Sequence, residues 1–279
     1  MGGTVVSAFW SWWVYNVHTD ITKMAIRSEF VDQETLKQIY KENQGADSTD
    51  NGKYFDHALH FDSEEFEVGC WKLANNLNTA IDYLSACEKP KALEKIGEAL
   101  HALQDFYSHS NWVENHLFNR STIVPSDIAI YTGLVSLRSD GVFIPGPLVA
   151  DLNFQDTCNP NPPDPPASTL VSGYEPPASR PTNKCLHQET NKDYDDPNVT
   201  FQPNTSSPRG AFVVNNKTLF VFAKDVAKRH TQALWQDFHQ AFWQRFGQEQ
   251  GEKYYKTLVG TQRRVAFAID VSGSMYAAL

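Results

Sequence analysis

The chain has 279 residues, of which 41% are hydrophobic and 20% charged, and its formal net charge at pH 7 is −9. This length allows a substantial core in one large domain or two small ones, and the composition is typical of a soluble globular protein. The acidic balance argues against a broad basic surface for duplex nucleic acid, because such surfaces neutralise phosphates with Lys and Arg. A local cationic site built from metal ions stays compatible with it, because bound ions are not part of this sum.

The first segment, MGGTVVSAFWSWWVY, is mostly apolar from Thr4 to Tyr15. It is shorter than the roughly 20 apolar residues that span a bilayer. It lacks the basic start of a signal peptide, although Val-Ser-Ala before Phe9 is typical of a cleavage site. An unusual export signal and a buried N-terminal segment therefore both stay open as interpretations.

Helical periodicity dominates residues 16–118 and returns from about residue 217 to 247. Apolar residues recur at three- and four-residue spacing in VHTDITKMAI, FEVGCWKLANNLNTAIDYLSA and KALEKIGEALHALQDFY. Pro90 separates the last two runs, and Gly247 is a typical residue to end a helix. The pattern predicts an all-α helical bundle over residues 1–262.

Residues 156–211 interrupt this pattern. The piece CNPNPPDPPASTLVSGYEPPASRPTNKC is rich in Pro, Ser and Gly and cannot form a regular element. Cys158 and Cys185 bracket it, which suggests an excursion closed at its base. We therefore expect one long irregular Pro-rich insertion in the helical domain.

Cysteines and glycosylation sequons favour an oxidising, secretory compartment. The four cysteines form no CxxC pair, which argues against a cysteine zinc knuckle. Proximity in sequence suggests the pairs Cys70–Cys87 and Cys158–Cys185. An even cysteine count together with four Asn-x-Ser/Thr triplets predicts secretion. The triplets begin at Asn119, Asn198, Asn204 and Asn216.

The run HALQDFYSHSNWVE places three metal-compatible side chains one helical turn apart. His101, Asp105 and His109 follow one another at four-residue spacing, so a helix puts them along one stripe. A buried carboxylate needs partners, and imidazole and carboxylate at this spacing can converge on a zinc ion. From spacing alone, a hydrogen-bonded polar seam is an equal alternative.

The same string resembles the hallmark of the heterokaryon-incompatibility HET-C family, which is related to zinc-dependent phospholipases C and, more distantly, to single-strand-specific zinc nucleases. YNVHTDITKMAI resembles the family's first-helix histidine segment, GADSTD its aspartate loop and ALHFD its second histidine segment. KCLHQETNKDY is similar to a stretch of those HET-C proteins that precede a von Willebrand factor A domain. The resemblance covers about residues 10–260 and implies a phospholipase C-like helical bundle with a cleft for two or three zinc ions.

The resemblance also implies a set of metal ligands. Asp47, His60, His101 and Asp105 would hold the first zinc, and Asp105 would bridge to a second ion. The family's His-x-x-x-Glu pair is absent after His109, so other residues are expected to replace it in binding the remaining ion. The implied ligands are His18, Asp47, His60, His101, Asp105 and His109, with Glu114 and His187 as the replacements.

The final segment has a separate resemblance. RRVAFAIDVSGSM, at residues 263–275, is similar to the opening strand of a von Willebrand factor A domain, whose DxSxS motif contributes to a metal-adhesion site. We interpret residues 263–279 as the truncated start of such a domain.

Three functions follow as expectations. The first is a zinc-dependent phosphodiesterase of the phospholipase C type, acting on phospholipid head groups at a membrane surface. In it, bound metal lowers the pKa of a water towards ~7, and Asp47 is the catalytic residue that orients or deprotonates that water. The second is a single-strand-specific zinc nuclease, which the 13% aromatic content permits. The third is a secreted, non-catalytic recognition or adhesion module with structural zinc.

Overall fold

The computed structural model describes residues 17–26, 31–49, 52–114, 133–146, 170–174, 181, 184–193, 213–214 and 217–260. These residues are mostly helical, which confirms the predicted all-α class. The longer helices are α1 (Val17–Ala25), α2 (Gln33–Gly45), α4 (Phe66–Ser85), α5 (Lys89–His109), α8 (Leu219–Phe246) and α9 (Gln248–Val259). The short ones are η2 (Lys53–Phe55), α3 (His57–His60) and α7 (His187–Thr190).

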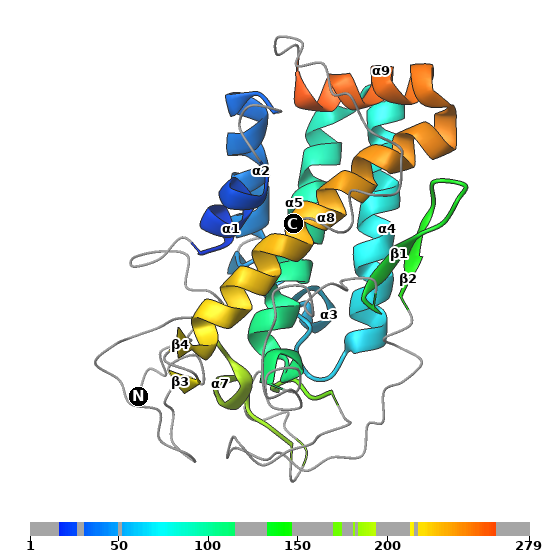
Figure 1. Ribbon diagram of the computed structural model, residues 1–279. Helices are drawn as coiled ribbons and strands as arrows, with labels where there is room; N and C mark the ends of the chain where they lie inside the picture. Colours follow the sequence, from blue (N-terminus) through cyan, green and yellow to red (C-terminus); the bar gives the residue numbers. More distant parts are fainter. Residues whose placement is uncertain are drawn as a thin grey trace.

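Helix α5 is the central element of the bundle. It packs against α2, α4 and α8, and α1 lies against α2 and α8. Figure 1 shows α4 and α5 side by side, with α8 crossing in front and α9 across the end of the bundle. Every residue of α5 from Ile96 to His109 is buried, so the polar side chains in this stretch must find partners inside the protein.

The approach of α2 to α5 depends on Gly97. A Cβ atom at this position would lie 2.5 Å from Glu42 Cβ and 2.7 Å from the backbone nitrogen of Asn43. Helix α2 begins at a well-formed cap, because the Asp32 carboxylate accepts hydrogen bonds from both the backbone nitrogen and the hydroxyl of Thr35. The close contact at Gly97 places the segment after α2 beside the buried half of α5.

The described residues also form two small antiparallel hairpins, and the hydrophobic periodicity did not predict these hairpins. One pairs β1 (Val135–Leu137) with β2 (Phe143–Pro145), and the other pairs β3 (Val213–Val214) with β4 (Lys217–Thr218). Strands of two or three residues are too short to show a repeating pattern in the sequence. Gly247 is the C-cap of α8, as predicted, with a positive φ (77°), and α9 follows it directly.

The predicted Cys70–Cys87 disulfide is wrong, since both cysteines are free. Cys70 is buried near the start of α4 and Cys87 is exposed beyond its end. A helix rises 1.5 Å per residue, so the two lie roughly 20 Å apart, far beyond disulfide reach. Cys185 is disulfide-bonded, and its predicted partner Cys158 lies outside the described residues.

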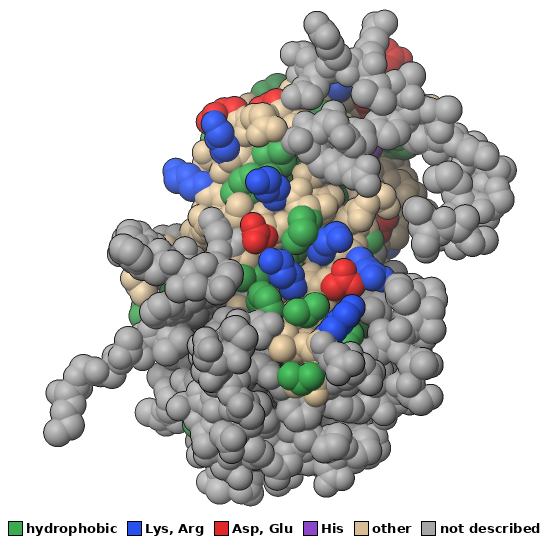
Figure 2. All heavy atoms as spheres, turned by 60° about the vertical axis from the view of Figure 1, so that its left-hand side comes forward, with side chains coloured by type: hydrophobic (Ala, Val, Ile, Leu, Met, Phe, Trp, Pro, Cys, Tyr) green, Lys and Arg blue, Asp and Glu red, His purple; other side chains and the backbone are tan. Residues whose placement is uncertain are grey.

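Several other predictions fall on parts of the chain that the structure does not describe. They are the apolar N-terminal segment, the four sequons, most of the Pro-rich insertion and the von Willebrand-like residues 263–279. Among the described helices, none is long and apolar enough to cross a membrane. Figure 2 shows hydrophobic, basic and acidic side chains interspersed on the described part of one face.

Candidate metal centre

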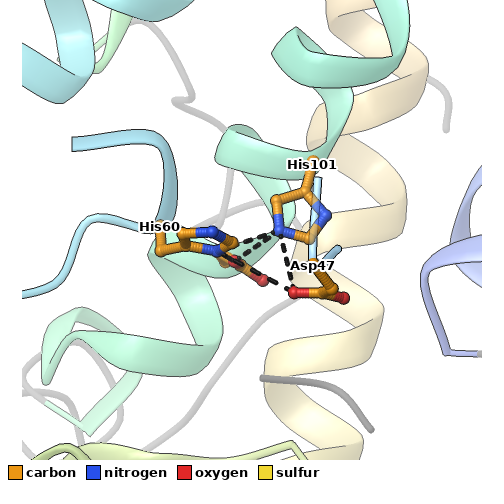
Figure 3. A group of neighbouring side chains, drawn as sticks. Asp47, His60 and His101 are labelled. Atoms are coloured by element: carbon orange, nitrogen blue, oxygen red, sulfur yellow. Dashed lines mark hydrogen bonds and ion pairs between the residues drawn. The ribbon is translucent and has the colours of Figure 1, made fainter. Parts of the chain in front are cut away.

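Four of the predicted ligands converge from three separate segments. Asp47 follows the end of α2, His60 ends α3, and His101 and Asp105 lie one turn apart on α5. Each offers one ligand atom, and these atoms all lie within 4.8 Å of one another. Figure 3 shows Asp47, His60 and His101 pointing towards one another between these segments. We call this set of four residues the first centre.

The ligand atoms of the first centre are close enough together to surround one position. The Oδ2 atom of Asp105 lies 2.8 Å from His60 Nδ1 and 2.9 Å from His101 Nε2. The two imidazole nitrogens are themselves only 3.1 Å apart. Asp47 Oδ1 is 3.5 Å from His101 Nε2 and 4.0 Å from His60 Nδ1.

His18 adds a fifth group beside this centre. It comes from α1, and its Nε2 atom lies 3.2 Å from Asp105 Oδ1, the oxygen opposite the one that faces His60 and His101. The His18 and His101 rings are stacked with centroids 4.3 Å apart. The structure therefore places His18 where the resemblance implied it, against the carboxylate of Asp105.

The first centre is deeply buried, and one of its carboxylates lacks hydrogen bonds. His101 and Asp105 are completely inaccessible to solvent, and Asp47 is 9% exposed. Within the described part of the chain, neither carboxylate oxygen of Asp47 accepts a hydrogen bond. A buried carboxylate without such partners is unfavourable by several kcal/mol unless a cation or a proton compensates it.

The pKa values show how the same groups behave when only protons compensate them. Burial, reinforced by the charge of Asp105, raises the pKa of Asp47 to about 7. Burial alone would lower the pKa of His60, but its hydrogen bond to Asp105 and the charges around it raise this pKa to about 9. Burial lowers the pKa of His101 to about 3, so this imidazole is neutral. Without an ion, the centre therefore depends on a proton at His60 and on partial protonation of Asp47 to balance its two carboxylates, and an ion bound there would displace these protons.

These residues fit a divalent metal ion. Two imidazole nitrogens and two carboxylate oxygens make up a donor set suited to tetrahedral zinc and to related borderline ions. The two Asp47 oxygens accept no hydrogen bond among the described residues, and such an ion would compensate their charge.

A second group of buried side chains involves Asp62, His109 and His187. Asp62 Oδ1 lies 2.9 Å from His187 Nδ1 and 3.3 Å from His109 Nδ1. Asp193 Oδ1 lies 3.3 Å from Nε2 of His109. Asn191 donates a hydrogen bond to His187 Nε2, so the proton of this ring is on Nδ1 and points at Asp62. Both ring nitrogens of His187 are thus hydrogen-bonded, whereas Nε2 of His109 has no hydrogen-bond partner among the described residues. Asp62, His109 and His187 each offer one ligand atom, and these atoms lie within 4.8 Å of one another, so this group has the geometry of a second metal site.

Sequence reasoning missed Asp62 and Asp193. Burial alone would raise the pKa of Asp62, but His187 and His109 hold it well below its usual value. Asp62 lies in the ALHFD string two residues after His60, and Asp193 ends the NKD stretch, so both were within reach of the motifs used. In each case the sequence feature that could have identified the residue is a carboxylate a few positions after a candidate histidine.

Glu114 does not join either group. Its carboxylate forms an ion pair with Lys192, whose Nζ lies 3.3 Å from Glu114 Oε2. Lys192 is completely buried and also donates hydrogen bonds to the carbonyls of Ser110 and Thr190. A buried ammonium needs its counter-ion, so the Glu114 carboxylate pairs with Lys192. It is therefore not the replacement metal ligand that the resemblance implied.

Comparisons with known proteins point to von Willebrand factor A domain-containing proteins. A family model described as the VWA7 N-terminal domain matches residues 15–127. The mouse von Willebrand factor A domain-containing protein 7 is 50% identical over 56 residues, which are 20% of this chain and 6% of that protein. Its human counterpart is 48% identical over 59 residues, 21% of this chain and 7% of that protein. The matches thus span a small part of these relatives, and no solved structure matches the chain.

These findings overturn the predicted phospholipase C activity. The family model and the relatives carry von Willebrand factor A descriptions, and none of them is described as a hydrolase. The prediction of a zinc-dependent phospholipase C-like hydrolase is therefore wrong. The relation to a von Willebrand factor A protein is supported, whereas the comparisons do not show a relation to the HET-C family. The non-catalytic alternative fits the comparisons better.

Proposed function

We propose that this chain is a non-catalytic recognition module of a larger von Willebrand factor A-type protein, and that a divalent metal ion in the first centre stabilises it. The observation that carries the proposal is the buried Asp47 carboxylate, which faces two imidazoles and accepts no hydrogen bond from the described residues. A cation bound there would compensate this charge and join the segment after α2, the end of α3 and the middle of α5.

Burial supports a structural role for this ion. Structural zinc sites have four protein ligands and are closed, whereas catalytic sites keep an open position for water or substrate. The first centre offers four ligands from the protein, and the most exposed of them, Asp47, is 9% accessible. An ion held in this way has no vacant position for a substrate.

The donor set favours zinc among common divalent ions. Imidazole and carboxylate together suit Zn²⁺, whereas Ca²⁺ and Mg²⁺ prefer sites made of oxygen atoms alone. We assign one ion, to the first centre, because both oxygens of the Asp47 carboxylate lack hydrogen bonds from the described residues there, whereas both ring nitrogens of His187 in the second group are hydrogen-bonded. Binding to the folded state alone would stabilise the fold by mass action.

The recognition role and the compartment rest on other observations. The relatives are described by a von Willebrand factor A domain, and we infer that the helical chain contributes a rigid scaffold for recognition in a protein of that type. The disulfide at Cys185 supports an oxidising, extracellular setting.

The test measures metal content, stability and turnover on one preparation. Protein purified without added metal is analysed for all divalent metals, and its unfolding temperature is compared before and after chelation. We expect about one zinc per chain, a lower unfolding temperature after chelation, and recovery when zinc is returned. Asp47→Asn should lose the ion, whereas the control Asp140→Asn, in the exposed β1–β2 turn, should keep it.

Turnover separates this function from the hydrolase that the comparisons argue against. Phosphatidylcholine and single-stranded DNA are incubated with the metal-loaded protein, and we expect no release above that of the Asp47→Asn variant. Metal-dependent hydrolysis, or less than a tenth of an equivalent of any divalent metal, would contradict the proposal.

A further inference from the structure

A layer of buried amide side chains lies behind the histidines that face Asp105. Asn43 comes from α2 and Gln104 from α5, and both are completely inaccessible to solvent. Gln104 lies between His101 and Asp105 in sequence, on the same buried half of α5. A buried amide is unfavourable unless it is hydrogen-bonded, so its partners indicate what it does.

The hydrogen bonds of Gln104 connect four helices. Its Oε1 atom accepts from His18 Nδ1 at 2.7 Å and from Asn43 Nδ2 at 3.3 Å. Its Nε2 atom donates to the hydroxyls of Thr22 at 3.0 Å and Thr231 at 3.3 Å. An amide has two acceptor sites and two donor hydrogens, and Gln104 uses all four.

Asn43 makes the matching contact to the other imidazole. Its Oδ1 atom lies 3.3 Å from His101 Nδ1, while its Nδ2 atom donates to Gln104 and to the hydroxyl of Thr22. The two amides are therefore linked to each other, and each presents an oxygen to one histidine. The result is a polar layer shared by α1, α2, α5 and α8.

This arrangement determines which ring nitrogen carries the proton. An amide oxygen only accepts, so it favours the tautomer of His18 and of His101 with hydrogen on Nδ1. With an ion bound, the Nε2 lone pair then faces the ion; without one, the same atom lies 3.2 Å from Asp105 Oδ1 in His18 and 2.9 Å from Asp105 Oδ2 in His101, where a proton on Nε2 would instead donate to the carboxylate. Outer hydrogen bonds of this kind orient metal-binding histidines, and their loss typically weakens metal binding 10–100-fold.

We propose that Asn43 and Gln104 are positioning residues that hold His18 and His101 in the Nδ1–H tautomer, with Nε2 directed at the first centre. The proposal rests on the proposed function, because the Nδ1–H tautomer is the form that leaves Nε2 free to bind an ion.

The first experiment is ¹H–¹⁵N NMR of the imidazole rings in zinc-loaded wild-type protein at pH 8.5. Long-range couplings distinguish the two tautomers of each histidine, and His18→Gln and His101→Gln variants assign the signals. We expect the Nδ1–H form for both rings. A dominant Nε2–H form in either ring of the zinc-loaded protein would overturn the proposal while leaving zinc binding, and so the proposed function, intact.

The second experiment compares variants that differ in the acceptor. Gln104→Met preserves the approximate volume but removes the oxygen, and we expect zinc affinity to fall 10–100-fold. Gln104→Glu keeps an acceptor facing His18 and should stay within about threefold of wild type. Gln38→Met is the matched control, because Gln38 lies on α2 and its amide donates a hydrogen bond to Glu42.

Circular dichroism and unfolding temperature identify variants that fail to fold, and Asn43→Asp and Asn43→Leu repeat the comparison on α2. A folded Gln104→Met protein that binds zinc as tightly as wild type would contradict the proposal. Absence of zinc binding in the wild type would overturn the proposed function and this inference together.

Discussion

Replacing Gly97 with alanine should weaken metal binding without altering any ligand. The added Cβ would lie 2.5 Å from Glu42 Cβ, and an ordinary contact begins at 3.4 Å, so α2 and α5 must separate by about 0.9 Å at this point. Two of the three close atoms belong to the backbone of Glu42 and Asn43, so rotation of a side chain cannot relieve the contact. Overpacking of this kind destabilises a domain by about 1–3 kcal/mol.

The same displacement reaches the first centre through α2, which carries Asn43 and leads to Asp47. Metal–ligand distances tolerate shifts of only about 0.2 Å, so a movement of this size should lower zinc affinity at least tenfold. The unfolding temperature should fall by roughly 2–10 °C for a domain of this size. Gly45→Ala is the control, because a Cβ there meets nothing within 4 Å.

Differential scanning calorimetry and a competitive zinc titration with a chelator measure the two effects. If Gly97→Ala matches Gly45→Ala in both unfolding temperature and zinc affinity, the contact between α2 and α5 does not hold the centre together. That result would refute the reasoning.

Three further predictions concern groups outside the first centre. Burial raises the pKa of Asp237 to about 6, above its unfolded value. The folded state therefore favours the protonated carboxyl, and this contribution to stability is lost as pH rises through about 6. Asp237→Asn should raise the unfolding temperature at pH 8 but not at pH 4. Equal effects at both pH values would contradict this. Lys192→Met should destabilise the fold by about 3–5 kcal/mol in chemical denaturation, because it leaves the buried Glu114 without its counter-ion. Adding Glu114→Gln should recover part of this loss. A double variant that is no more stable than Lys192→Met would count against the pairing. In alkylation followed by mass spectrometry, the native protein should react at exposed Cys87 and not at buried Cys70, and modification at Cys70 before unfolding would show that α4 is not packed as described.

The helical class and the metal-compatible stripe of α5 could be predicted from local pattern. His101, Asp105 and His109 are linked by one helical period, and any helix over this segment aligns them. His18, Asp47 and His60 come from three other segments, and spacing alone could not bring them to Asp105. They were selected through a resemblance, and the structure places them around that carboxylate.

The remaining features depend on contacts between distant segments. Asp62 and Asp193 each lie close to a candidate histidine in the sequence, but only the packing of distant segments shows that both meet His109. The sequence does not distinguish Gln104 from other polar residues of a helix, and only the packing of α5 shows that it is completely buried. The incorrect Cys70–Cys87 pair has the same origin, because proximity in sequence took no account of the length of α4 between the two cysteines.

Anomalous X-ray diffraction from crystals grown without added metal tests the central claim most directly. Data collected on either side of the zinc absorption edge would locate an ion without reference to activity. The account predicts an anomalous peak within about 2.0–2.2 Å of ligand atoms from Asp47, His60, His101 and Asp105. Well-ordered side chains at these positions with no anomalous peak in such crystals would contradict it.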